Sequence, residues 1–317
     1  MKIEFEKADN IAKSLNKETL KNLPVLVYQL TSNLDTDVEK FRAIYTWISL
    51  NIKSDYPHQL QNLKMRKKFL DDSISLNLWN TKFREKTLKR LIKNKKTICT
   101  GYAYLLEELA SLAGLNCKMI HGYGRNVSAN IDELSQPNHS WNAVLLNNKW
   151  YLSDPTWSSG FFNVDEGVFV HDYNSGYFLA DPSLFVKSHY PLDSKWVLMD
   201  EFIPTIQDFL TGPLVYGDAF KYSILPLEPE KMKSEINKGD KQIFRFIVPE
   251  EAKSNQIRLV IDSGSHQNKI DTYSYNQETE ILEFMHTFSN RGLFDIHLQV
   301  NNTFVVTYAV KVIKPKS

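Results

Sequence analysis

Apolar residues recur at helical spacing through the first third of the chain. Residues 36–39 read Thr-Asp-Val-Glu, which matches a capping box in which the threonine caps a helix and the glutamate reaches back. The apolar stripe of the predicted helix then contains Val38, Phe41, Ile44, Tyr45, Ile48 and Ile52. Residues 10–33 predict one or two further helices, interrupted at Pro24.

A second well-marked helix is predicted directly after the basic run at residues 93–96. Thr97 is placed to cap its N-terminus, Cys99 falls in its first turn, and Gly114 is placed to end it. The predicted buried stripe contains Tyr102, Leu105, Leu106, Leu109, Leu112 and Ala113. The N–H groups and dipole of a first helical turn favour the thiolate form of a cysteine there. Cys117, at the start of an apolar run, is predicted to be a buried strand residue.

Two alternating segments, residues 139–146 and 149–154, predict a β-hairpin. They are separated by Asn147-Asn148, and asparagine tolerates the positive φ angles of a two-residue type I′ turn. This register pairs Leu146 with Lys149. It makes His139 and Asp154 diagonal neighbours, about 5.5–8 Å apart at the backbone and within side-chain reach.

A shift of this register by one residue would place His139 and Asp154 on opposite faces of the hairpin. In the predicted register, the face that carries them is the more apolar one. Its members are His139, Trp141, Ala143, Leu145, Trp150, Leu152 and Asp154. We therefore predict that this face turns toward the helix that carries Cys99.

Residues 58–96 have a different texture because basic side chains dominate them. Twelve lysines and arginines face only three acids, Asp71, Asp72 and Glu85. One interpretation is a basic surface near the site that attracts an acidic substrate. The other is a solvated helical insertion with Leu88, Leu91 and Ile92 as its buried stripe. Charge runs are usually solvent-exposed faces, which favours the second interpretation.

The second half of the chain changes character twice. Residues 160–213 are rich in aromatics and show little regular pattern, so they predict a loop-and-short-helix extension over the first domain. We interpret His171 and His189 as packing or hydrogen-bonded residues. Short alternating strands separated by turn residues then predict an immunoglobulin-like β-sandwich without chemistry of its own. We thus expect domains at 1–213, with a core at about 36–160 and an extension at 161–213, and at 214–317.

The composition mainly excludes certain classes of partner and site. The 317 residues have a net charge of +1, with 42% hydrophobic and 24% charged residues, as in ordinary soluble proteins. This charge gives no global attraction to nucleic acid or anionic membranes. We expect no membrane span and no signal peptide, so the compartment stays open between cytoplasmic and exported after leader removal. Two cysteines form neither a disulfide framework nor a four-cysteine zinc site. We expect no metal and no cofactor, and the oligomeric state is unknown.

The order Cys99, His139, Asp154 is typical of a thiol enzyme that transfers acyl groups. In this interpretation Cys99 attacks a carbonyl, His139 takes and returns a proton, and Asp154 orients the imidazole ring. The backbone N–H of Cys99 is the expected first oxyanion donor, and a second donor is not identifiable. Weaker candidates for supporting the site are Trp141, Trp157 and Thr100.

Three motifs carry a resemblance to a known family: residues 99–103 (Cys-Thr-Gly-Tyr-Ala), 139–144 (His-Ser-Trp-Asn-Ala-Val) and 150–157 (Trp-Tyr-Leu-Ser-Asp-Pro-Thr-Trp). Over about residues 20–210 the chain resembles the transglutaminase-like superfamily of papain-like thiol enzymes, and its kyphoscoliosis-peptidase branch in particular. Thr97 departs from the small residue common at that position. The basic insertion has no counterpart that can be aligned.

The resemblance implies an α+β fold, in which a cysteine-bearing helix packs on an antiparallel sheet, followed by the all-β sandwich. It also implies a Cys-His-Asp triad that acts on protein or peptide amide bonds through a thioester. Hydrolysis is favoured by the peptidase-like branch. Amine transfer, as in a transglutaminase that cross-links proteins, is one alternative. A non-catalytic protein-binding or scaffolding module that keeps the fold is the other.

Overall fold

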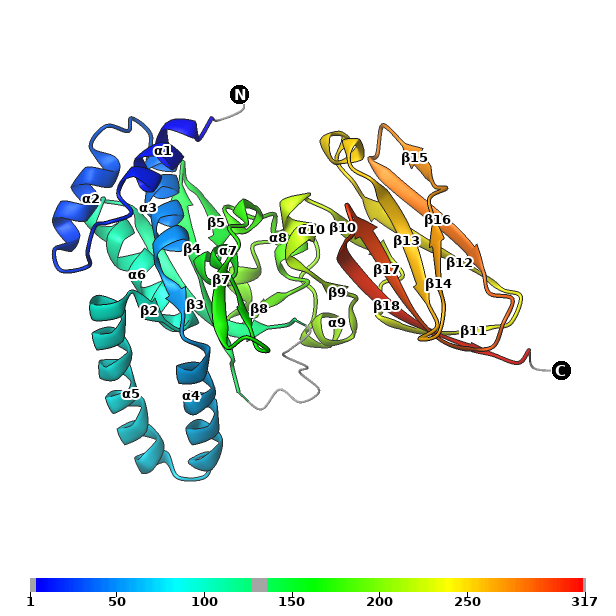
Figure 1. Cartoon of the computed structure of the whole chain (residues 1–317), viewed down its shortest axis with the longest axis horizontal. Helices are drawn as coiled ribbons and strands as arrows, with labels where there is room; N and C mark the ends of the chain where they lie inside the picture. The colour runs from blue at the N-terminus through cyan, green and yellow to red at the C-terminus, as the bar shows by residue number, and fades with distance from the viewer. Residues whose placement is uncertain (1–3, 127–135, 316–317) are drawn as a thin grey trace. The chain divides into compact units, whose positions relative to one another are not determined.

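The computed structural model describes residues 4–126 and 136–315 of the chain. It forms two compact units, one of residues 1–121 with 139–179 and the other of residues 122–138 with 180–317 (Figure 1). The first combines helices with an antiparallel hairpin and the second is rich in strands, so the predicted α+β class is confirmed. Residues 180–213 group with the C-terminal strands, and the domain boundary expected at residue 213 stays a prediction.

The first unit is mainly helical. Its helices are α1 (Glu6–Ser14), α2 (Leu23–Thr31), α3 (Asp37–Asn51), α4 (Tyr56–Lys68), α5 (Ser73–Asn94), α6 (Cys99–Leu112), α7 (Pro155–Ser159) and the 3₁₀ helix η1 (Ser175–Tyr177). Its strands are β1 (Lys53–Ser54), β2 (Lys96–Thr97), β4 (His139–Leu146), β5 (Lys149–Ser153), β6 (Gly160–Asn163) and β7 (Val168–His171). Strand β3 (Asn116–Gly124) runs from this unit into the second.

Helix α3 is the central helix of the first unit. The predicted capping box is confirmed, because Thr36 Oγ1 accepts from the Glu39 N–H at 3.3 Å and Glu39 Oε2 accepts from the Thr36 N–H at 3.0 Å. Ten of its fifteen residues are buried, which is more than one apolar stripe supplies. The interruption at Pro24 is also explained, since Pro24 lies in the first turn of α2, where its missing N–H is not needed.

The basic segment forms a helical hairpin of α4 and α5 (Figure 1). This confirms a helical insertion, but the predicted buried stripe was partly wrong. Leu91 is buried together with Phe83 and Thr87, whereas Ile92 is 50% exposed. Phe83 and Thr87 both contact the buried His58 of α4. The apolar pattern of α5 alone does not reveal such contacts with a second helix. Although α5 has 22 residues, none of the helices described here has the length and apolar character to cross a bilayer.

Helix α6 packs against the β4–β5 hairpin. The predicted turn is confirmed, since Asn147 and Asn148 have φ of +50° and +61° and Leu146 pairs with Lys149. Strand β3 lies on the other side of β4, in the order β5-β4-β3. Gly114, with φ of +78°, follows the end of α6 as predicted.

The strands described from residue 214 to residue 313 form two sheets. One has the order β10-β12-β16-β15 and the other β11-β18-β17-β13-β14, with β9 added at β18. The bounds are β9 (Leu214–Val215), β10 (Leu225–Glu228), β11 (Lys233–Asn237), β12 (Lys241–Ile247), β13 (Ile257–Asp262), β14 (Gln267–Ile270), β15 (Ser274–Asn276), β16 (Ile281–Thr287), β17 (Gly292–Val300) and β18 (Thr303–Ile313). Phe244 of β12 contacts Tyr308 of β18 at 5.5 Å between ring centroids, so the sheets face each other as a sandwich. Strands β14 and β15 follow each other closely in the sequence but belong to different sheets, because the chain crosses between the sheets there.

Short elements precede this sandwich within the second unit. They are α8 (Pro182–Phe185), β8 (His189–Pro191), the 3₁₀ helix η2 (Ser194–Val197), α9 (Ile206–Thr211) and α10 (Gly217–Lys221), and the 3₁₀ helix η3 (Glu250–Ser254) lies between β12 and β13. The end of β3 pairs with β8, with Gly122 opposite Pro191. The short pieces agree with the irregular pattern of the aromatic-rich sequence.

An ion pair fixes α1 to α3. The Arg42 guanidinium donates to both carboxylate oxygens of Asp9, at 2.7 and 2.9 Å, and Thr46 Oγ1 donates to the same carboxylate at 2.9 Å. Three aromatic rings lie 4.8–5.9 Å from the guanidinium: Phe178, Phe5 and Tyr173. The Arg42 side chain is only 8% exposed, so it depends on Asp9 for a counter-charge.

We expect the substitution Asp9→Asn to lower the free energy of unfolding of the first unit by about 3 kcal/mol, because it leaves a buried guanidinium uncompensated. Urea denaturation followed by tryptophan fluorescence measures this, since five of the six tryptophans lie in that unit. Lys40→Gln, which removes an exposed partner of Asp37, is the control and should change stability by about 0.5 kcal/mol or less. Equal effects of the two changes would show that Asp9 does not hold α1 in place.

Candidate active site

The first turn of α6 positions Cys99. The helix begins at Cys99 itself, and Ile98 is the capping position without a side-chain hydrogen bond. The predicted Thr97 cap was therefore wrong: Thr97 is a buried residue of β2, and it lies against Gly101, where a Cβ atom would come within 1.8 Å of Thr97 Oγ1. Glycine at this position lets the strand end directly beside the helix. Cys99 is thus held where first-turn N–H groups lack helical carbonyl partners.

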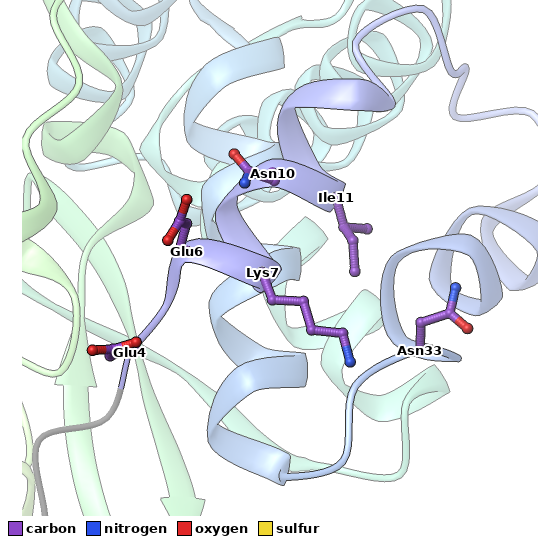
Figure 2. A pocket seen from close by; sticks show the side chains of 6 residues that line it. All are labelled: Glu4, Glu6, Lys7, Asn10, Ile11 and Asn33. Carbon is purple, nitrogen blue, oxygen red and sulfur yellow. The ribbon is translucent and has the colours of Figure 1, made fainter.

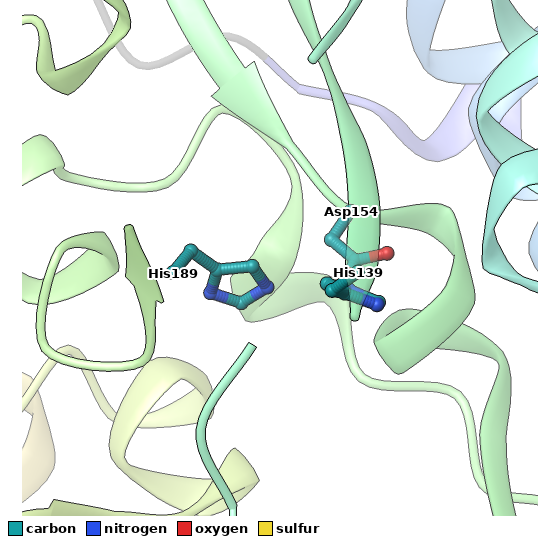
Figure 3. A group of neighbouring side chains, drawn as sticks. All are labelled: His139, Asp154 and His189. Atoms are coloured by element: carbon teal, nitrogen blue, oxygen red, sulfur yellow. The ribbon is translucent and has the colours of Figure 1, made fainter. Parts of the chain in front are cut away.

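Asp154 follows β5 and caps α7. Its Oδ1 accepts from the N–H groups of Thr156 and Trp157 at 2.7 and 3.2 Å, and its Oδ2 lies 2.7 Å from His139 Nε2. Figure 3 shows the Asp154 and His139 side chains next to each other. The carboxylate is fully buried, and His139 is 7% exposed. The hairpin register predicted this neighbourhood, and the two side chains do meet. A buried carboxylate with these donors is a strong anchor for an imidazole ring.

The ionisation of Cys99 and His139 is coupled. Burial raises the pKa of the Cys99 thiol, but a hydrogen bond to His139 and the charge of that ring outweigh burial, so the pKa is lowered. Burial lowers the pKa of His139, but the charge of Asp154 and hydrogen bonds to Asp154 and Cys99 raise it above its ordinary value. Both shifts favour a thiolate beside an imidazolium.

The three weaker candidates also lie at this site. The Trp157 ring stacks on His139 at 4.9 Å, and the fully buried Trp141 ring lies 6.0 Å from it. A hydrogen bond to the Thr100 side chain contributes to the lowered pKa of Cys99. The structure therefore brings together all six residues that the sequence singled out.

One prediction about the hairpin was wrong, namely which face of β4 turns toward α6. Asn142 Nδ2 donates to Ala103 O at 2.9 Å, and Val144 and Leu146 belong to the core formed with α6. The even-numbered face therefore packs on the helix, whereas Trp141 and Ala143 lie on the other. Seven of the eight residues of β4 are buried, so apolar character does not distinguish its two faces.

Cys117, His171 and His189 have structural surroundings. Cys117 is buried in β3, and burial raises its pKa to about 12. His171 lies edge-on to Phe169 at 4.8 Å. His189, also labelled in Figure 3, belongs to the second unit, where its Nδ1 lies 2.9 Å from Ser188 Oγ and its ring stacks on Phe185. These contacts agree with the packing roles expected for the three residues.

Two supporting features were not found from the sequence. Tyr45 Oη of α3 donates to the Asp154 carbonyl oxygen at 2.9 Å, and the Asp154 N–H donates to Tyr177 O at 3.1 Å. Ser140 Oγ lies 2.9 Å from His121 Nδ1 and 3.5 Å from Thr100 Oγ1. Tyr45 was placed in an apolar helical stripe, and nothing nearby in the sequence indicates a partner 109 residues away.

A surface hollow of about 840 Å³ lies elsewhere in the first unit (Figure 2). Its lining residues are Glu4, Glu6, Lys7, Asn10, Ile11 and Asn33. These come from the start of the chain, α1 and the turn after α2, and none belongs to α6, β4 or the Asp154 turn. Charges of both signs surround it without a convergent set of groups, so we assign it no chemistry.

Comparison with known proteins gives an independent view. The profile of the Transglutaminase-like superfamily matches residues 25–155. Human kyphoscoliosis peptidase is 32% identical over 198 residues, which cover 62% of this chain and 27% of that protein. Hillarin of Drosophila melanogaster is 30% identical over 235 residues, 70% of this chain and 26% of that protein. The Lim and transglutaminase domain protein ltd-1 of Caenorhabditis elegans is 25% identical over 275 residues, which cover 76% of this chain and 34% of that protein. The chain thus spans about a quarter to a third of the length of these relatives.

We expect iodoacetamide to alkylate Cys99 at least about tenfold faster than Cys117 at a pH near 6, because burial raises the pKa of both thiols but His139 outweighs it only at Cys99. Peptide mass spectrometry after a timed reaction measures both rates. The rate at Cys99 should rise with pH and level off below the ordinary thiol pKa, because the folded-state pKa is lowered.

The variant His139→Gln provides the control. Without the imidazole, burial and the charge of Asp154 raise the pKa of the thiol and outweigh the hydrogen bond to Thr100, so the inflection should move to a pH above the ordinary value. Slow and equal labelling of both cysteines in the unchanged protein would contradict the geometry.

Proposed function

Because residues 25–155 belong to the transglutaminase-like superfamily, in the branch that includes kyphoscoliosis peptidase, we propose that the chain is a thiol-dependent acyl-transfer enzyme. Its substrates are amide bonds of proteins or peptides, and hydrolysis is the favoured outcome. Cys99 is the nucleophile, His139 the acid and base, and Asp154 the residue that orients His139. The observation that carries the proposal is the buried 2.7 Å contact of His139 with Asp154, beside a thiol whose pKa is lowered by His139.

The first half-reaction forms a thioester. His139 uses Nε2 for Asp154, so Nδ1 is the ring nitrogen that takes the thiol proton of Cys99. The thiolate sulfur attacks the carbonyl carbon, and the oxyanion accepts hydrogen bonds, with the Cys99 backbone N–H as its first donor. The C–N bond then breaks, and His139 returns the proton to the leaving amine. Asp154 stays ionised throughout, since the α7 N–H groups hold its charge.

The second half-reaction removes the acyl group. Water gives up a proton to His139 and attacks the thioester, which releases a carboxylic acid and restores the thiol. If a lysine amine attacks instead, the product is an isopeptide cross-link and the chain acts as a transglutaminase. The human relative is named a peptidase, which supports water as the acyl acceptor. The superfamily is named after transglutaminases, which supports an amine as the acceptor.

Neighbouring side chains support the proposed chemistry. Stacking of Trp157 on His139 limits rotation of the ring about its side chain, and Asp154 fixes the tautomer. Thr100 stabilises the thiolate by a hydrogen bond. Such fixed partners reduce the reorganisation needed as charge moves from sulfur to the acyl oxygen.

The central test is the loss of activity on an unfolded protein such as casein. We expect Cys99→Ala to abolish peptide release and Asp154→Asn to lower kcat by about 10²–10⁴-fold, because an amide cannot hold the imidazolium. Cys117→Ala and Asp165→Asn, the latter at an exposed turn position, are the matched controls and should keep full activity. If Cys99→Ala retained activity, the nucleophile would be misassigned.

A second measurement identifies the acyl acceptor. With hydrolysis favoured, we expect new amino termini in casein and little incorporation of dansylcadaverine. Incorporation that depends on Cys99 would make the chain a transglutaminase instead. Neither product, in a protein whose Cys99 alkylates rapidly, would favour the binding-module alternative.

A further inference from the structure

The α4–α5 hairpin concentrates the positive charge of the chain. Residues 56–96 contain twelve basic and three acidic side chains, a net charge of +9, whereas the whole chain carries only +1. The other residues together therefore carry −8. A local excess of this size produces a strong positive potential in one region, although the average charge is nearly neutral.

Exposed apolar side chains lie among these charges. Along α5 one stripe at helical spacing consists of Ile74, Leu78, Lys82, Glu85, Lys89 and Ile92, and all six are exposed. Its apolar members are strongly exposed: Ile74 by 74%, Leu78 by 59% and Ile92 by 50%. The buried stripe of Phe83, Thr87 and Leu91 lies on the opposite side of the helix. Large aliphatic side chains left in water at this density indicate a contact surface.

The base of the hairpin is fixed beside Cys99. Strands β1 and β2 pair in parallel, with Lys53 opposite Lys96, and the Asp55 N–H donates to Thr97 O at 2.7 Å. The buried Asp55 carboxylate also accepts from Arg90 Nε at 2.6 Å. Since α5 leads within a few residues into α6, the C-terminal end of α5 lies close to the proposed nucleophile, and a molecule held along α5 is directed toward it.

We propose that the exposed face of α5 is a docking surface for an acidic protein segment that also carries apolar side chains, and that it recruits such proteins to Cys99. Docking does not depend on catalysis, whereas the recruitment of a substrate rests on the proposed function. The acids of the partner face Lys82, Lys86, Lys89 and Lys93, and its apolar side chains cover Ile74 and Leu78. Complementary charge then speeds the encounter, and the apolar contacts add affinity.

The distribution of these residues favours a protein partner over two others. A helix that lies on a membrane segregates an apolar face from a basic face, whereas in α5 lysines and aliphatic residues share one stripe. Surfaces for single-stranded nucleic acid use aromatic rings on which bases stack, and this stripe contains no aromatic residue.

The test measures binding in the full chain with Cys99→Ala, so that turnover plays no part. The probes are two fluorescein-labelled peptides, one of Asp, Glu and Leu and the other with Asn and Gln in place of the acids. We expect the acidic peptide alone to bind, by fluorescence anisotropy at low salt, and to weaken as salt rises. Replacing Lys82, Lys86, Lys89 and Lys93 by Gln should raise its Kd about tenfold or more.

Two further variants make this specific. Replacing Lys13, Lys17, Lys238 and Lys241 by Gln changes the net charge equally at exposed positions elsewhere, and should alter the Kd less than about twofold. Ile74→Ser with Leu78→Ser should weaken binding about fivefold. Far-UV circular dichroism checks that each variant keeps its helices. Equal weakening by both lysine sets would overturn the proposal, as would tighter binding to phosphatidylserine vesicles or to a single-stranded oligonucleotide.

Recruitment is then tested in the active protein. We expect the four hairpin substitutions to raise KM for an acidic protein substrate while leaving kcat unchanged, because docking stabilises substrate and transition state alike. An unchanged KM would remove the recruitment role. If the protein with Cys99 has no activity on any substrate, the proposed function fails, but the peptide measurement still decides whether α5 is a docking surface.

Discussion

The candidate site depends on the charge of one fully buried carboxylate. Moving an ionised group out of water costs several kcal/mol unless hydrogen bonds replace its hydration. In Asp154 the replacement comes from two N–H groups of α7 and from His139. The backbone of the same residue is held by Tyr45 and Tyr177. The site is therefore also a junction of α3, β4, β5 and α7, and its geometry is as stable as the core around it.

Features that depend on neighbouring residues could be predicted from the sequence. The capping box at Thr36, the positive φ angles at Asn147 and Asn148, and the resulting register are set by local chemistry. That register was enough to bring His139 and Asp154 together, because strand pairing converts a position in sequence into a position in space. The likeness of three motifs to the superfamily then supplied the position of Cys99 relative to both.

What could not be predicted depends on partners far along the chain. Strand β4 is buried on both sides, so its alternation did not reveal which face contacts α6. Which residues of α5 are buried depends on their contact with His58 of α4, and not only on the apolar residues of α5. Thr97 looked like a helix cap, but it pairs in β2 and lies against Gly101. In each case a tertiary contact decides between local arrangements that the sequence leaves nearly equal in free energy.

The pairing of β1 with β2 has a consequence for how this fold can change. The chain leaves the core at Lys53 and returns at Lys96 on an adjacent strand, about 4.8 Å away. Topologically, α4 and α5 are therefore a closed loop whose two ends meet at the core, where Leu91 of α5 is buried and Tyr56 of α4 stacks on Phe162. Because loop-closure entropy grows only slowly with length, the part of the hairpin beyond these contacts can be lengthened, shortened or exchanged with little effect on the core. Evolution is thus free to vary this segment in descendants of the fold while the thiol, the imidazole and the carboxylate stay in register.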